Sequence, residues 1–199
     1  MRKGNEKIKS EKSIKGYKQH IQNNKSRFNM KLPICGFDAK NAVLCLGCEN
    51  KVTNGILTQA DVDASIILAK IAKTANEIEG FALYSCREFD GNYVLYLAKN
   101  DILAIRQSRT LYGQLQEQFK GKIWLVEADE NDKRFIEDLF FPTKILSINS
   151  VWAPGGVQKT KAVVSGRWTP KFPIDTEKVV LIVKNARNLD IEIEFEDKR

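Results

Sequence analysis

Histidine is almost absent from the sequence. The 199 residues contain one histidine, His20, which lies in a polar segment near the start of the chain. A histidine in such a segment is poorly placed for the buried dyads that activate catalytic nucleophiles. The sequence also contains no P-loop, no G-x-S-x-G elbow and no H-E-x-x-H metal motif. We therefore expect a protein that is not an enzyme and that has no small-molecule substrate.

Long apolar runs are absent as well. A membrane span needs about 18 apolar residues, and no stretch of the sequence approaches that length. The charged N-terminus is not followed by the apolar region of a secretory signal. The four cysteines are too few and too clustered for a disulfide framework, which fits a reducing compartment. These absences predict a cytoplasmic protein with no membrane partner.

Positive charge is present, and it is concentrated at one end of the chain. Residues 1–29 contain nine basic and two acidic residues, which account for the whole formal net charge of +7. This segment is rich in Lys, Asn, Gln and Ser and has few apolar residues, so we expect a disordered basic arm. Such an arm suits RNA phosphates, but a solvated tail without a specific role fits its composition equally well. A further alternative is that translation begins at Met30 rather than Met1.

The rest of the chain divides into a short cysteine segment, residues 30–56, and two larger units. The first unit, residues 57–128, reads as helix, strand, strand, helix, helix, strand, and a Thr58–Asp61 capping box opens its first helix. The second unit, residues 129–199, repeats this order with one helix fewer. Each unit is expected to form a three-stranded sheet backed by helices, so the predicted class is α+β. The strands are expected at residues 81–89, 93–98 and 122–127 in the first unit and at 145–152, 161–168 and 189–195 in the second.

The cysteine segment and the two units together have a specific resemblance. Residues 31–55, KLPICGFDAKNAVLCLGCENKVTNG, followed by a capped helix and the two units, resemble the archaeal NusA-like KH-domain proteins, a family of transcription elongation and termination factors. The most telling parts are Pro33-Ile34-Cys35, Val43-Leu44-Cys45-x-x-Cys48 and Phe135-Ile136-Glu137-Asp138-Leu139. The resemblance implies two tandem KH units of bacterial-type topology that bind single-stranded RNA or RNA polymerase.

The cysteine segment departs from the family at one position. Members of the family carry paired C-x-x-C knuckles whose thiolates suit tetrahedral zinc, but this chain has Asp38 where the second cysteine is expected. Because a carboxylate can also bind zinc, the resemblance implies a zinc site made of four residues, Cys35, Asp38, Cys45 and Cys48. The alternative is that these cysteines are small buried hydrophobic residues of a relic knuckle. Cys86 lies in a predicted strand and is expected in the core.

The nucleotide-binding loops depart from the family as well. A KH unit holds four nucleotides with a GXXG loop between its two helices, where missing β-carbons let backbone N–H groups approach the phosphates. The first unit has no glycine at this place, because its loop is Arg106-Gln107-Ser108-Arg109. The two arginines can still hold phosphates through bidentate hydrogen bonds. The alternative is that they are ordinary solvated charges.

The second unit also lacks the glycines of a GXXG loop. Its loop region, residues 169–173, contains two prolines and is interpreted as a structural or protein-docking surface. Trp168 is close in sequence to Arg167 and Lys171, so it is the aromatic residue that we expect first to stack on an RNA base. Packing within the sheets is the alternative for the aromatic residues of both units.

Together these features predict a non-catalytic, RNA-binding accessory factor of transcription, similar to the NusA-like family. One alternative is a protein-interaction scaffold, in which the KH folds remain without their nucleotide contact and the cysteine knuckle docks a protein. The other alternative is a ribosome-associated factor that binds structured RNA with the same surfaces.

Overall fold

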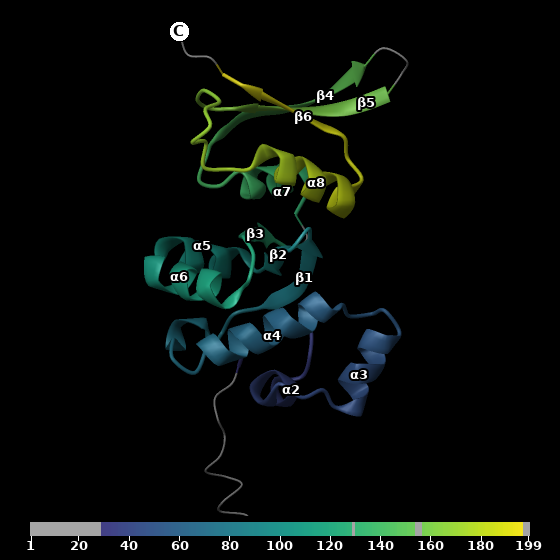
Figure 1. Cartoon of the computed structure of the whole chain (residues 1–199), viewed down its shortest axis with the longest axis vertical. Helices are drawn as coiled ribbons and strands as arrows, with labels where there is room; N and C mark the ends of the chain where they lie inside the picture. Colours follow the sequence, from purple (N-terminus) through teal and green to yellow (C-terminus); the bar gives the residue numbers. More distant parts are fainter. Residues whose placement is uncertain (1–28, 129, 154–156, 197–199) are drawn as a thin grey trace, which may run out of the picture.

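The protein is described by a computed structural model that covers residues 29–128, 130–153 and 157–196. The predicted basic arm lies outside the described residues except for Asn29. Helices and strands are stacked in layers along the long axis of the molecule (Figure 1). The structure is α+β and contains two separate three-stranded sheets, as predicted. No helix among the described residues is long and apolar enough to cross a membrane.

The first unit contains three helices that cover one face of a mixed sheet. Its elements are α4 (Gln59–Ile71), the 3-10 helix η1 (Asn76–Ile78), β1 (Leu83–Phe89), β2 (Asn92–Leu97), α5 (Lys99–Gln107), α6 (Arg109–Gln118) and β3 (Ile123–Glu127). The strand order is β1-β2-β3, with β1 and β2 antiparallel and β2 and β3 parallel. The parallel pair requires a crossover connection, and α5 and α6 provide it.

Local signals explain where the first elements begin and turn. The predicted capping box is present, because Asp61 N donates to Thr58 Oγ1 (3.2 Å) and Thr58 N donates to Asp61 Oδ2 (2.8 Å). The second carboxylate oxygen of Asp61 accepts a hydrogen bond from Cys86 N (2.6 Å), which fixes α4 against β1. Asp90 and Gly91 have φ values of 49° and 69°, as the two-residue turn between β1 and β2 requires.

The second unit repeats the order with a single helix between its last two strands. Its elements are α7 (Asp132–Leu139), β4 (Ile145–Ala153), β5 (Val157–Val164), α8 (Thr176–Arg187) and β6 (Ile191–Phe195). The strand order is β4-β5-β6, again antiparallel and then parallel. The strand predicted at residues 161–168 was misplaced, because β5 ends at Val164 and Gly166 turns the chain with a φ of 98°. Trp168 therefore lies on a loop.

The two units share a hydrophobic core. One face of the first sheet packs against α4, α5 and α6, while its other face carries Val94, Trp124 and Val126. These three side chains belong to the same buried cluster as Phe135 of α7 and Val179 of α8. Helices α7 and α8 therefore lie between the two sheets, as Figure 1 shows. The first unit is packed directly against the second.

The cysteine segment packs on the outer side of α4. It contains α2 (Gly36–Asn41) and α3 (Leu46–Thr53). Its small core consists of Ile34, Ala39 and Cys48, which pack against Val62 and Ala69 of α4. A core of this size gives the segment little stability of its own, so it depends on α4 and on any additional cross-link between α2 and α3.

Candidate metal centre and nucleic-acid interface

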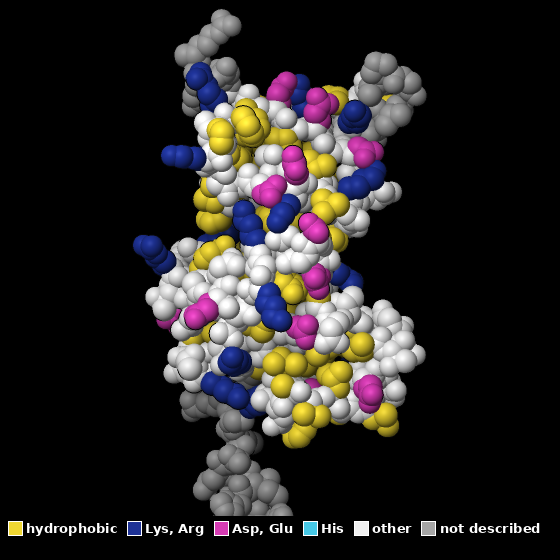
Figure 2. Space-filling view, in the orientation of Figure 1, with side chains coloured by type: hydrophobic (Ala, Val, Ile, Leu, Met, Phe, Trp, Pro, Cys, Tyr) yellow, Lys and Arg dark blue, Asp and Glu magenta, His cyan; other side chains and the backbone are white. Residues whose placement is uncertain are grey.

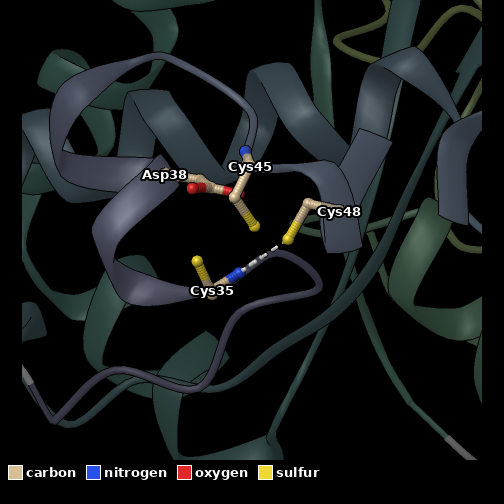
Figure 3. Close-up of side chains that lie close together, drawn as sticks. All are labelled: Cys35, Asp38, Cys45 and Cys48. Carbon is tan, nitrogen blue, oxygen red and sulfur yellow. Dashed lines mark hydrogen bonds between the residues drawn. The ribbon is translucent and has the colours of Figure 1, made fainter. Parts of the chain in front are cut away.

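The predicted metal ligands lie at matching positions of two helices. Cys35 is the N-cap of α2 and Asp38 is the third residue of that helix. Cys45 is the N-cap of α3 and Cys48 is its third residue. Side chains at the N-cap and at the third position lie on the same side of a helix start. Each helix therefore presents two ligands as a pair, and Figure 3 shows the three sulfur atoms turned toward one another.

The four side chains form one compact cluster. One ligand atom from each of Cys35, Asp38, Cys45 and Cys48 lies within 4.8 Å of the others. In a zinc tetrahedron with Zn–S bonds of about 2.3 Å, ligand atoms are about 3.8 Å apart. Small side-chain movements thus close the cluster around an ion. Two backbone hydrogen bonds hold it together, from Cys45 N to Asp38 Oδ2 (3.0 Å) and from Cys35 N to Cys48 Sγ (3.4 Å).

The electrostatics of the cluster favour a cation. The Cys48 thiol and the backbone N–H of Cys45 beside the Asp38 carboxylate stabilise its ionised form and lower the pKa of Asp38 to about 2. Burial and the neighbouring Asp38 raise the pKa of the Cys48 thiol to about 12. A bound divalent ion supplies the positive charge that a coordinating thiolate needs. The cluster thus combines a carboxylate that is ionised with a thiol that an ion would ionise.

A buried oxygen of Asp38 that lacks a hydrogen-bond partner supports the fit of the cluster to a metal ion. Asp38 is fully buried, and its Oδ1 has no hydrogen-bond partner among the described residues. A buried oxygen without a partner is costly, and coordination to an ion satisfies it. Three thiols and one carboxylate are a donor set that zinc accepts. Zinc bound by these residues would cross-link α2 and α3, the two helices whose shared core is small.

The predicted nucleotide loop is reduced to a single residue. Arg106 and Gln107 end α5, Arg109 begins α6, and Ser108 alone connects the two helices. The hydroxyl of Ser108 accepts a hydrogen bond from Leu111 N (3.3 Å) and so caps α6. Gln107 and Arg109 are exposed.

Arg106 points inward and joins the two units. Its Nη1 forms an ion pair with Asp138 Oδ1 (3.1 Å), and its Nη2 donates to the carbonyl of Leu125 (3.1 Å). The guanidinium also lies over the ring of Phe141, 4.1 Å from the centroid. The assignment of Arg106 to RNA stays a prediction, and its observed contacts give it a role in holding the second unit against the first.

A cavity opens beside the connection between α5 and α6. Its volume is about 320 Å³, and its lining includes Arg106, Arg109, Tyr112, Leu125, Asp138 and Phe141. Tyr112 is 38% exposed and Phe141 is 50% exposed, so two aromatic rings are accessible at this place. Neither was predicted as a site residue, although Tyr112 follows Arg109 by three residues and so shares its helix face. Phe141 had no comparable local signal, because it comes from the other unit.

The second predicted contact lies on the loop between β5 and α8. Arg167 and Lys171 are exposed, and Trp168 is 59% exposed. The Nζ of Lys122, at the start of β3, donates to the carbonyl of Pro173 (3.4 Å). This contact places the loop near β3, the strand that forms part of the cavity wall. Cys86 is fully buried in the core of the first unit, as expected.

Comparisons with known proteins give little further information. No family model matches the chain, and no match was found among curated proteins. Among solved structures, one described as "Crystal structure of APE1850" aligns with 65% of this chain and 95% of its own length. Its sequence identity is 20% and its TM-score is 0.40. A similarity at this level supports no conclusion about the function of the chain.

Proposed function

We propose that this chain is a non-catalytic, RNA-binding accessory factor of transcription, similar to the archaeal NusA-like proteins, with two tandem KH units. The observation that carries the proposal is the cavity beside Ser108, at the place where a KH unit holds nucleotides between its two helices. The order of α4, β1, β2, α5, α6 and β3, with a parallel last strand, is the order that the resemblance implies.

The cavity has the chemistry that unpaired nucleotides need. The exposed rings of Tyr112 and Phe141 offer faces on which a base stacks. Arg109 lies in the same lining and, being exposed, can hold a phosphate through its guanidinium. Because no glycine is present at the α5–α6 connection, the phosphate contact here comes from a side chain rather than from backbone N–H groups. The site is therefore selective for single strands and weak in sequence preference.

The loop after β5 extends this surface. Trp168 presents an exposed ring next to Arg167, and Lys171 adds a positive charge. Lys122 connects this loop to the start of β3. An RNA strand that leaves the cavity along β3 would therefore reach the loop next. In this proposal zinc has a structural part only, which is to hold α2 and α3 on the outer side of α4.

Binding of a fluorescent oligouridylate at several salt concentrations tests the proposal. We expect Arg109→Ala to weaken binding and to reduce the salt dependence by about one phosphate contact. Tyr112→Ala removes a stacking ring, which costs about 1–3 kcal/mol, a loss of affinity of about fivefold to 150-fold. Lys73→Ala is the matched control, because it removes one exposed charge from a residue that lies outside the cavity lining. Deletion of residues 1–29 measures the contribution of the basic arm separately.

A specific result would reject the RNA proposal. If the two cavity variants bind RNA as the control does, and deletion of residues 1–29 abolishes binding, then the folded part does not contact RNA. In that case the protein-interaction scaffold becomes the better proposal.

One observation favours the scaffold as a second candidate function. Large apolar side chains are exposed on the cysteine segment, and hydrophobic side chains gather over α2 and α3 in Figure 2. They are Phe37 (69% exposed), Val43 (64%), Leu46 (73%) and Ile56 (67%). Exposed apolar groups that lie together are a common feature of protein-binding surfaces. If this surface binds RNA polymerase, Leu46→Ser weakens binding to purified polymerase and leaves oligouridylate binding unchanged.

A further inference from the structure

A second cavity lies between the two units, at the β1 edge of the first sheet. Its volume is about 370 Å³, which is within the range of about 300–1,000 Å³ typical of small-ligand sites. The polar side chains that line it are Tyr84, Ser85, Arg87, Tyr96 and Arg187. None of these residues lines the cavity beside Ser108, whose strand wall is β3 at the opposite edge of the same sheet.

The register of β1 explains why these side chains meet. The pairing of β1 with β2 shifts between Leu83 and Ser85, so Tyr84 is the extra residue of a β-bulge. After the bulge, Ser85 pairs with Tyr96 and Arg87 pairs with Val94. Val94 faces the second unit, and residues paired or spaced by two share a face. Ser85, Arg87 and Tyr96 are thus directed to the space into which the end of α8 brings Arg187.

Two unpaired polar atoms belong to residues of this cavity. The Oγ of Ser85 and the Nε of Arg187 are buried and have no hydrogen-bond partner among the described residues. Arg187 is nevertheless held in place, because its Nη2 donates to the Glu130 carbonyl (3.1 Å) and its guanidinium lies 4.8 Å from the Phe135 ring centroid. Its Nε forms an ion pair of 3.8 Å with the exposed Asp132 Oδ1, a distance that is too long for a hydrogen bond. Two side chains of the lining thus each carry a buried polar atom that lacks a hydrogen-bond partner among the described residues.

The charge at the cavity favours an anion. Arg87 is exposed and forms no ion pair with any residue that the structure describes. Burial raises the pKa of Tyr96, while the charges of Arg187 and Arg87 oppose this change, so both guanidinium groups act on one hydroxyl. Two arginines that converge on hydroxyl groups are a common arrangement for phosphate recognition.

Tyr84 supplies the remaining element of a nucleotide site. The bulge places its ring at the cavity with 55% of the residue exposed. An exposed ring next to a phosphate site offers a face for the base of the same nucleotide. We propose that this cavity is a second nucleotide-binding site, in which Arg87 and Arg187 hold the phosphate and Tyr84 stacks on the base. The assignment of the nucleotide to an RNA chain rests on the proposed function, whereas the phosphate site itself does not.

Two exposed residues allow the site to be tested without loss of the fold. Arg187 packs against the buried Phe135, so its substitution could destabilise the fold and is not used. The variants are Arg87→Ala, Arg87→Lys and Tyr84→Ala, and Lys73→Ala is the control. Melting temperatures close to that of the wild type confirm that each variant is folded. Oligouridylate affinity is measured by fluorescence, and binding of uridine monophosphate and of inorganic phosphate is measured from NMR shifts of the arginine side chains.

The expected result is a loss of about tenfold in oligouridylate affinity for Arg87→Ala and for Tyr84→Ala. Arg87→Lys keeps the charge but not the planar fork, so it recovers only part of the affinity. Because the two cavities share none of these side chains, Arg87→Ala combined with Arg109→Ala should lose roughly the product of the single losses. Inorganic phosphate should shift the Arg87 side-chain signal in the wild type, and uridine monophosphate should do so at lower concentration.

The possible outcomes separate this inference from the proposed function. If Arg109→Ala weakens RNA binding while Arg87→Ala and Tyr84→Ala match the control, and phosphate shifts no arginine signal, the inference is wrong and the function stands. If uridine monophosphate binds and Arg87→Ala abolishes its binding, but the chain binds no oligouridylate, the site is supported for a free nucleotide and the RNA function is rejected.

Discussion

Arg106 of α5 and Asp138 of α7 form an ion pair of 3.1 Å between Nη1 and Oδ1 that connects the two units. The side chains are 12% and 3% exposed, so the pair is almost completely buried. Asp138 also accepts a hydrogen bond from Glu127 N (3.0 Å) through its other oxygen. The carboxylate thus has partners for both oxygens, and Arg106, the first residue of the expected nucleotide loop, stabilises the interface between the units.

Removing one partner of this pair should destabilise the protein strongly. Arg106→Ala leaves a buried carboxylate without its counter-charge, which typically costs about 3–5 kcal/mol. Urea denaturation measures the loss. Arg134→Ala is the matched control, because Arg134 pairs with Glu137 at the surface, where both side chains are at least 34% exposed, and such pairs contribute about 0–1 kcal/mol. Equal losses for the two variants would contradict the role assigned to Arg106.

A second buried carboxylate should have a comparable effect within the first unit. Asp61 accepts hydrogen bonds from Thr58 N (2.8 Å), Thr58 Oγ1 (2.8 Å) and Cys86 N (2.6 Å). Asp61→Ala removes the carboxylate half of the capping box and leaves the buried Cys86 N–H unpaired, so we expect a loss of roughly 3 kcal/mol. Asp175→Ala, at the exposed cap of α8, should cost about 1 kcal/mol. Urea denaturation measures both losses of unfolding free energy. Equal losses for Asp61→Ala and Asp175→Ala would contradict the larger role assigned to the buried carboxylate.

Features with a local signal could be predicted from the sequence. The Thr58–Asp61 capping box and the Asp90–Gly91 turn are made by residues that are adjacent or three apart, and both are present. The two halves of the metal cluster are local in the same way, because each helix start contributes a pair of residues three positions apart, but the joining of the two pairs into one site was implied by the family resemblance. The start of β5 was missed because residues 157–161 are mostly polar. Their strand conformation comes from pairing with β4, and of these five residues only Thr160 and Lys161 also pair with β6.

Features that depend on packing between the units could not be predicted in the same way. The contact between Arg106 and Asp138 joins residues 32 positions apart, and no sequence pattern relates them. Residues 122–127 were predicted as a strand without a statement of which faces it buries, and Ile123, Trp124, Leu125 and Val126 are all buried. A continuous apolar run is typical of a strand covered on both faces. This run therefore contained a signal that the second unit packs on the first sheet.

The ligand at position 38 should control the affinity for zinc. We expect one zinc per chain after purification without a chelator. Asp38→Cys should raise the affinity, because it replaces a hard carboxylate with a thiolate that zinc prefers, and Asp38→Ala should lower it by tenfold or more. Substitution with Co²⁺ gives a second measurement, since the intensity of the thiolate-to-metal absorption increases with the number of thiolates, from three in the wild type to four in Asp38→Cys.

The control for the zinc experiment is Glu49→Gln. Glu49 lies in the first turn of α3, next to Cys48, but it is not part of the ligand cluster. Its substitution should leave the zinc affinity and the Co²⁺ spectrum unchanged. A protein that retains no zinc, and that gives no thiolate absorption with Co²⁺, would show that the cluster holds no metal. Of the three cysteines only Cys48 is buried, so it alone fits the alternative of a small hydrophobic residue in a relic knuckle, while Cys35 and Cys45 are exposed.

A close approach between two glycines should make position 121 intolerant of any side chain. A β-carbon on Gly121 would lie 1.8 Å from the carbonyl oxygen of Gly91, which belongs to the turn between β1 and β2. Because the neighbour is backbone, Gly121→Ala must displace this turn or the start of β3, and overpacking of this kind costs about 1–3 kcal/mol. Gly113→Ala is the control, because a β-carbon there has no neighbour within 4 Å, and alanine is favoured over glycine in a helix by about 1 kcal/mol. Urea denaturation should therefore give opposite signs for the two substitutions. If Gly121→Ala is as stable as the wild type, the turn and the start of β3 can separate, and β3 is not the fixed wall that the proposed RNA site requires.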